Sequence, residues 1–192
     1  MNDFAFYFDL GIKHILSVDA LDHILFIIAL AAIYLAPNWK QVLILVTAFT
    51  IGHSLTLVLS TYNIISFDDK WVEFFIPLTI VITALSNFFV KDYTLQSLRF
   101  NYVFATGFGL IHGMGFANTI KFMLAKDQLI ALPLFSFNVG LEVGQVIVVA
   151  LILLAGYLVV TIAGFPRKWW VWGLSSIAFI IASSICIKRF PL

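Results

Sequence analysis

The sequence is poor in charge and in cysteine, and each scarcity excludes a class of protein. Only 11% of its 192 residues are charged, whereas a soluble domain carries about 25%, so an ordinary water-soluble fold is excluded. The net charge of +1 provides no basic surface for nucleic acid, and we expect no nucleic-acid partner. The single cysteine, Cys186, excludes an internal disulfide and leaves no set of thiolate ligands for a metal.

The sequence is rich in long apolar stretches, and 62% of its residues are hydrophobic. A helix that crosses a hydrocarbon core of about 30 Å needs roughly 20 apolar residues. The stretches between charged residues predict six spans, at about 18–36, 41–62, 72–90, 100–122, 137–160 and 169–187. All five tryptophans fall at span ends, as expected of side chains at a membrane–water interface. The predicted fold class is therefore all-α: a polytopic transmembrane helix bundle with about six spans, forming a single transmembrane domain over residues 1–192.

Two stretches do not fit a simple crossing. The residues ahead of the first span, 1–17, are predicted to form an N-terminal interfacial or re-entrant segment. Residues 128–166 carry a single charge, Glu142, over a stretch too long for one crossing. We therefore place the span at 137–160 and expect 128–136 to lie in the interface or to dip into the protein. Basic residues divide almost evenly between the two sides, so the positive-inside rule does not fix the orientation.

Six ionisable side chains lie inside or at the mouth of these apolar spans, namely His14, Asp22, His23, His53, His112 and Glu142. An aspartate at the bilayer centre costs about 2.5–3.5 kcal/mol on insertion scales, so such groups are rarely kept unpaired and unused. Three arrangements would relieve the cost: a metal that neutralises the carboxylates, protonated carboxylates, or Asp–His pairs. Imidazole with carboxylate is the ligand set of nickel, zinc, copper and iron. We therefore predict that these six residues bind a divalent transition metal ion, with these four metals open at this point.

The first of these polar clusters extends over residues 11–23. On one continuous helix, His14 and Asp22 would share a face, and Asp19 would lie one turn before His23. The whole cluster could then point at one site near a membrane surface. The alternative is an interfacial helix over 1–17 on which His14 and Asp19 are simply solvated.

The next two clusters place histidines in the middle of spans. His53 is followed by Ser54, which we expect to support it, and its alternative role is a hydrogen bond between helices. His112 lies beside a stripe of small residues that recur every four positions, Ala105, Gly109, Gly113 and Ala117. Such a stripe lets another helix approach closely, and packing alone could account for its glycines.

The last cluster forms a polar stripe in the fifth span. Asn138, Glu142 and Gln145 fall at i, i+4 and i+7 of an otherwise apolar helix, so the stripe faces the bundle interior. Glu142 could be a metal ligand, a proton carrier or an acceptor for a histidine N–H. We expect Asn138 and Gln145 to support the ligands rather than to bind the metal.

Four short motifs carry a resemblance to a known family. They read DHILF from Asp22, FTIGHSLTL from Phe49, HGMGFA from His112 and FNVGLEVGQ from Phe137. Together they resemble the second subfamily of the HupE/UreJ family, over about residues 8–188. The resemblance implies a small multi-pass protein of the bacterial inner (plasma) membrane with six spans. Family members associated with hydrogenase or urease are regarded as nickel permeases.

Three functions remain open at this point. The first is a divalent-metal permease of the nickel type, with the 11–23 cluster at its entrance. The second is an intramembrane metal-dependent hydrolase that acts on a lipid or a membrane peptide, with Glu142 or Asp22 as general base. The third is a metal-free proton-coupled carrier or an assembly factor. The expected partners are the lipid bilayer and the metal ion, with a homo-oligomer as a further option.

Overall fold

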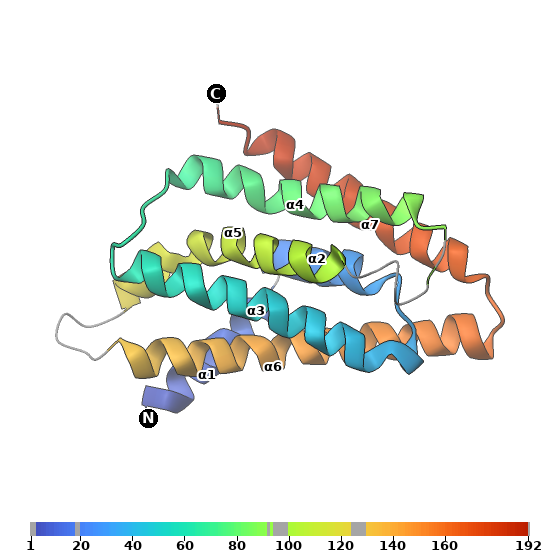
Figure 1. Cartoon of the computed structure of the whole chain (residues 1–192), viewed down its shortest axis with the longest axis horizontal. Coiled ribbons are helices and arrows are strands. Elements are labelled where there is room, and N and C mark those ends of the chain that lie inside the picture. Colours follow the sequence, from blue (N-terminus) through green and yellow to red (C-terminus); the bar gives the residue numbers. More distant parts are fainter. Residues whose placement is uncertain (1–2, 18–19, 92, 94–99, 124–129, 192) are drawn as a thin grey trace.

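The fold is a bundle in which the longer helices run roughly along one common axis, some in one sense and some in the other (Figure 1). The computed structural model describes residues 3–17, 20–91, 93, 100–123 and 130–191. The helices are α1 (Asp3–Leu16), α2 (Leu21–Ala31), α3 (Trp39–Thr61), α4 (Asp69–Phe89), α5 (Phe100–Met123), α6 (Ala131–Gly156) and α7 (Arg167–Lys188). A short helical turn, η2 (Ala36–Asn38), precedes α3, and a π-helical segment, η3 (Tyr157–Ile162), extends α6. The described residues contain no strand, which confirms the all-α class for that part of the chain.

Four helices within the described ranges are long and apolar enough to cross a membrane. They cover Ala36–Thr61, Asp69–Phe89, Ala131–Ile162 and Arg167–Lys188. A fifth crossing is added if α1 and α2, whose axes differ by 67°, count as one bent span. Helix α5 is long enough, but glycine, histidine and asparagine reduce its hydropathy, and it is not among the four. The predicted count of six spans therefore stays a prediction.

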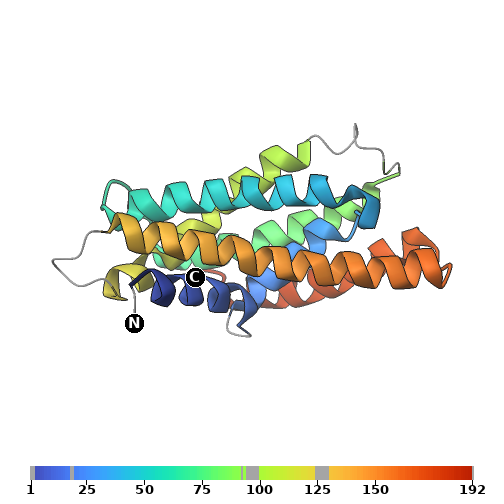
Figure 2. The same cartoon turned by 90° about the horizontal axis from the view of Figure 1, so that it is seen from below.

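The structure differs from the predicted first span, 18–36. Helix α2 has 11 residues, which at 1.5 Å each make about 16 Å, or half of a hydrocarbon core. Since α1 and α2 are separate helices, His14 and Asp22 do not share a face of one continuous helix, and that interpretation was wrong. Asp19 lies outside the described residues. Figure 2 shows α1 lying along the first half of α6 and α2 continuing into the bundle.

A second difference concerns the start of α6. The segment 128–136 was expected to lie in the interface or to dip into the protein, but from Ala131 onward it forms the first turns of α6. Pro133 is no obstacle, because proline is tolerated in the first turn, where the backbone N–H has no helical partner. Residues 128 and 129 lie outside the described ranges.

Helices α3 and α5 approach each other closely through the predicted small-residue stripe. A Cβ added to Gly109 would collide with the carbonyl oxygen of Phe49, and one at Gly113 with that of His53. The packing role of the stripe is thus confirmed, with α3 as its partner. Because the two backbones touch here, His53 and His112 lie at the same level of the bundle.

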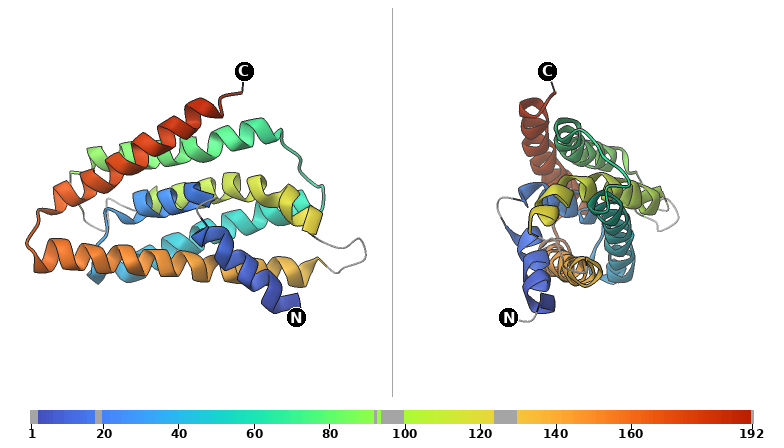
Figure 3. Two further views of the ribbon diagram at one scale, coloured as in Figure 1. Left: turned by 180° about the vertical axis from the view of Figure 1, so that it is seen from behind. Right: turned by 90° about the vertical axis from the view of Figure 1, so that its left-hand side faces the viewer.

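Helices α1 and α6 form a second close pair, and the end-on view in Figure 3 shows α1 against α6 at the margin of the bundle. A Cβ at Gly11 would collide with the carbonyl oxygen of Phe137, and one at Gly140 with that of Phe8. This contact fixes α1 beside α6 and carries His14, near the end of α1, to the level of Phe137, whose ring lies 5.6 Å from that of His14.

Candidate metal centre

The four histidines of the chain meet in one place, although they come from the four helices α1, α2, α3 and α5. Ring centroids lie 4.6 Å apart for His14 and His23, and 5.1 Å apart for His23 and His112. The His53 ring lies 6.2 Å from that of His23 and 6.3 Å from that of His14. His14 is half-buried and the other three are buried. The structure thus brings together all four histidines that the sequence singled out.

Three of the rings come close to the spacing of a metal site. One ring nitrogen from each of His14, His23 and His53 lies within 4.8 Å of the other two. Nitrogens around a tetrahedral zinc ion, with bonds of about 2.0–2.1 Å, lie about 3.3 Å apart. Small rotations of these rings would therefore bring them to coordination distance, and the donor set suits a divalent transition metal.

Asp22 fixes the orientation of His23. Its Oδ1 accepts a hydrogen bond from the His23 backbone N–H at 3.0 Å and lies 3.2 Å from the ring Nδ1. An ionised carboxylate can only accept, so the ring proton is on Nδ1 and the lone pair is on Nε2. That Nε2 is buried and without a hydrogen-bond partner. A carboxylate behind an imidazole, with the other nitrogen free, is the usual arrangement of metal-binding histidines.

Thr79 fixes His112 by a similar logic. The Thr79 hydroxyl donates its only proton to the Ile76 carbonyl at 2.7 Å, and its oxygen lies 3.1 Å from His112 Nε2. The oxygen can therefore only accept from the ring, which places the proton of His112 on Nε2. The lone pair is then on Nδ1, which is buried and unpartnered. Two of the four imidazoles thus present a free lone pair in the interior.

The remaining histidines also carry free nitrogens. Both ring nitrogens of His53 and Nε2 of His14 are buried without a hydrogen-bond partner. Asn138 donates to the Leu134 carbonyl at 2.8 Å, which leaves its buried Oδ1 unpartnered. A neutral imidazole carries one N–H, so one nitrogen of each ring is an acceptor. Buried polar groups are normally satisfied, so the unpartnered ring nitrogens make this cluster the candidate place for a ligand.

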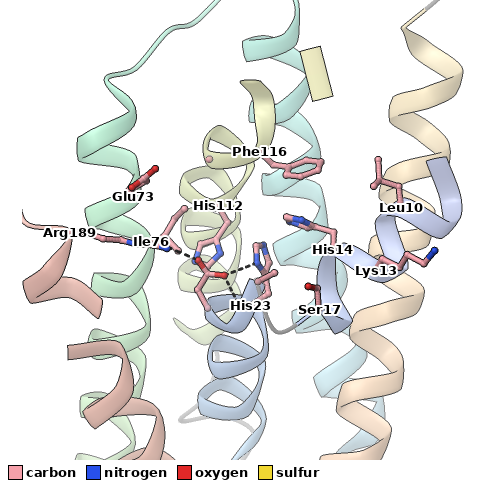
Figure 4. A pocket seen from close by; sticks show the side chains of 13 residues that line it. Leu10, Lys13, His14, Ser17, His23, Glu73, Ile76, His112, Phe116 and Arg189 are labelled. Carbon is pink, nitrogen blue, oxygen red and sulfur yellow. Dashed lines mark hydrogen bonds and ion pairs between the residues drawn. The ribbon is translucent and has the colours of Figure 1, made fainter. Parts of the chain in front are cut away.

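A pocket of about 440 Å³ leads to the cluster, lined by His14, His23, His112 and Asp22. In Figure 4 the three histidine rings point toward one another across it, and Phe116 lies beside them. The Phe116 ring lies 4.1 Å from that of His14 and covers it. Charged side chains surround the opening, with Lys13 on one side and Glu73 and Arg189 on the other.

Sequence reasoning missed several residues of this site. Arg189, just after α7, lies 3.7 Å from Asp22 through its guanidinium, and Glu73 of α4 lines the pocket. Neither was singled out from the sequence, because nothing in the spacing relates them to the histidines. Thr79 could have been noticed as a hydroxyl on an apolar helix, but threonine is common in membrane helices.

The polar stripe of α6 lies against α3 rather than in the pocket. Glu142 accepts a hydrogen bond from Thr47 at 2.6 Å, and Gln145 accepts one from Thr50 at 2.9 Å. Glu142 is not part of the histidine group, so its role as a metal ligand stays a prediction. Ser54 is half-buried on α3, next to His53 in the chain.

Four clustered histidines, three of them with the spacing of a metal site, lie with a paired carboxylate in a bundle whose described part has four helices long and apolar enough to cross a membrane. These features define a polytopic membrane protein with a candidate metal centre. The chain belongs to the HupE/UreJ family, since the family described as HupE / UreJ protein matches residues 1–189. This confirms the resemblance carried by the sequence motifs. Neither the curated proteins nor the solved structures gave a match to the chain.

Proposed function

We propose that this protein binds a divalent transition metal ion, nickel or zinc, at the four-histidine cluster and passes it across the bacterial inner membrane. The observation that carries the proposal is the set of unpaired ring nitrogens beside a pocket with a charged rim. A permease must replace the water around an ion and yet release it. Neutral imidazoles on separate helices provide such a site, because small movements between helices change the coordination.

The break between α1 and α2 favours transport. Both histidines of this bent pair lie close to the break, His14 near the end of α1 and His23 in the first turn of α2. Discontinuous helices that meet near the middle of the membrane are typical of ion and substrate sites in transporters. In this proposal α1 and α2 form one broken span, which with α3 to α7 makes six.

One observation favours a second candidate, the intramembrane hydrolase. Three histidines with a free coordination position are also the ligand set of catalytic zinc. Asp22 would have to act as general base there, because Glu142 bonds to Thr47 at a distance from the pocket lining. Asp22 is already engaged by His23 and Arg189, which makes it a poorer base and leaves the permease as the better-supported function.

Metal content tests the site directly. Purified protein is loaded with Ni²⁺ or Zn²⁺, freed of excess metal and compared by elemental analysis with the His53→Ala and His112→Ala variants. We expect the wild type to retain metal and both variants to lose most of it. Glu142→Gln tests the separate prediction that this carboxylate is a ligand: loss of metal would support it, and retained metal would leave the carboxylate with its Thr47 partner alone. Unchanged metal content in both histidine variants would refute the assignment.

Metal flux then separates the two candidates. Wild-type protein in liposomes should admit Ni²⁺ or Zn²⁺ above the rate of protein-free liposomes, and His112→Ala should not. A protein that retains metal but shows no flux above background would contradict the permease and support the hydrolase.

A further inference from the structure

A second pocket, of about 90 Å³, lies in the bundle apart from the histidine cluster. Half of its lining is polar, contributed by α4 and α5, and half is apolar; the polar residues are Thr83, Ser86, Asn87 and Asn101, and the apolar residues are Leu30, Ile82, Phe104 and Phe108. At roughly 30 Å³ for each water in the liquid, the space holds about three water molecules. Polar side chains inside a membrane protein are usually paired or functional, so we ask which of the two applies to this lining.

The polar side chains that α4 gives to this pocket have committed their hydrogens elsewhere. Thr83 donates its hydroxyl proton to the Thr79 carbonyl at 2.8 Å, and Ser86 donates to the Thr83 carbonyl at 2.7 Å. The Asn87 amide donates to a carbonyl of α2 at 2.7 Å and to a hydroxyl of α7 at 2.9 Å. These three side chains can offer a ligand only oxygen lone pairs. Such a lining attracts a cation, and neutral oxygens bind a transition metal more weakly than imidazoles do.

The two pockets follow one another between the same three helices. On each helix, a residue that lines the histidine pocket lies seven positions from one that lines the second pocket: His23 and Leu30 on α2, Ile76 and Thr83 on α4, Gly115 and Phe108 on α5. Seven residues are two turns, or about 10 Å along a helix. Because α5 runs opposite to α2 and α4, all three pairs lead toward the same end of the bundle (Figure 1).

Aromatic rings fill the interval between the pockets. Phe26 is fully buried on α2, one turn from Asp22 and one turn from Leu30. Its ring lies 5.4 Å from that of His112 and 6.0 Å from that of Phe108, which lines the second pocket. A hydrophobic constriction of this kind excludes water and ions when closed.

We propose that the second pocket is a weak cation site on the release side of the histidine cluster, and that Phe26 and Phe108 form the closed constriction between the two. The inference rests on the proposed function, because it names the second half of the path that a permeating ion would follow. The ligand is a partly hydrated divalent cation. The cation exchanges imidazole nitrogens for neutral oxygens as it moves from the first pocket to the second. The protein's affinity for the cation therefore falls along the path, which allows release.

Thiol accessibility tests the path without any metal. The only native cysteine can be removed as Cys186→Ser, and Ile76→Cys and Thr83→Cys then place one thiol in each pocket, on the same face of α4. A charged, membrane-impermeant thiol reagent is added to one side of sealed vesicles at a time. We expect Ile76→Cys to react from one side and Thr83→Cys from the other. Reaction of both from the same side, or no reaction of Thr83→Cys from either side, would overturn the proposal.

Flux measurements test the constriction and the oxygen lining. Phe108→Ala, at a half-buried position, should raise Ni²⁺ flux severalfold without changing metal content, and Phe26→Leu should act in the same direction. Thr83→Val should lower flux with metal content unchanged, whereas Thr106→Val, a hydroxyl of α5 outside both pockets, should not. Unchanged flux in all three pocket variants would refute the path while leaving metal binding intact. A wild type without metal and without flux would instead refute the proposed function and, with it, the cation path that rests on it.

Discussion

Replacing Thr79 with valine tests whether a fixed tautomer of His112 matters for metal binding. Valine keeps the shape of threonine and removes the oxygen that accepts the His112 Nε2 proton at 3.1 Å. The ring is then free to turn or to carry its proton on Nδ1, the nitrogen that is buried without a partner in the structure. Because Thr79 is only 3% exposed, water does not easily replace the lost acceptor.

The expected loss can be bounded from this geometry. Removing a group that orients a metal-binding histidine typically weakens metal binding by about 10- to 100-fold, which is about 1.4–2.7 kcal/mol. The unsatisfied ring N–H should also lower the free energy of unfolding by about 1–3 kcal/mol. Competition with a coloured chelator at fixed pH measures the affinity of the purified protein for Ni²⁺ or Zn²⁺.

Two matched variants make the experiment decisive. Thr79→Ser keeps the hydroxyl and should bind metal nearly as the wild type does. Thr61→Val removes a buried hydroxyl of α3 that has the same kind of bond to a backbone carbonyl but no histidine, and it should leave the affinity unchanged. Wild-type affinity in Thr79→Val, or equal losses in the serine and valine variants, would refute the tautomer argument.

Three further predictions concern packing, charge and pH. Gly113→Ala should sharply lower the melting temperature in detergent, because the new Cβ collides with the His53 carbonyl oxygen, whereas Gly107→Ala meets nothing within 4 Å and should be tolerated. Arg189→Gln removes a positive charge beside Asp22 and should raise metal affinity; a lower affinity in an equilibrium titration would contradict this. The free energy of unfolding should change by less than about 1 kcal/mol, because the contact with Asp22 is 3.7 Å long and the arginine is 38% exposed. Metal should be released as the pH falls, because each imidazole must be unprotonated to bind, and a pH-independent affinity would exclude histidine ligation.

Much of the helical arrangement was predictable because the relevant signals are local. Apolar runs between charges predicted α3, α4, α5 and α7 to within a few residues, since a membrane leaves the backbone few alternatives to a helix. The separation of α1 from α2 was not predictable in this way. The residues between Leu16 and Leu21 include only one charge, Asp19, so composition does not show whether the helix continues or ends there. The contact of α1 with α6 involves residues far apart in the sequence and has no local signal.

Some features of the candidate site could be predicted from the sequence and others could not. That His23, His53 and His112 face one another could be inferred, because lipid cannot surround imidazoles. The position of Glu142 could not, because its carboxylate has several possible donors and the sequence does not show which helix lies opposite; the structure pairs it with Thr47. Likewise, the contact of Arg189 with Asp22 joins opposite ends of the chain and has no local signal.

The close contact of α1 with α6 has a consequence for biosynthesis. Gly11 lies against the backbone at Phe137, so the helix that carries His14 obtains its partner only after α6 has left the ribosome. Until then, α1 lacks the helix against which its glycine packs, so His14 is not yet fixed beside the three other histidines. The candidate metal centre is therefore completed late in synthesis, and a chain truncated before α6 should insert helices into the membrane without gaining a finished histidine cluster.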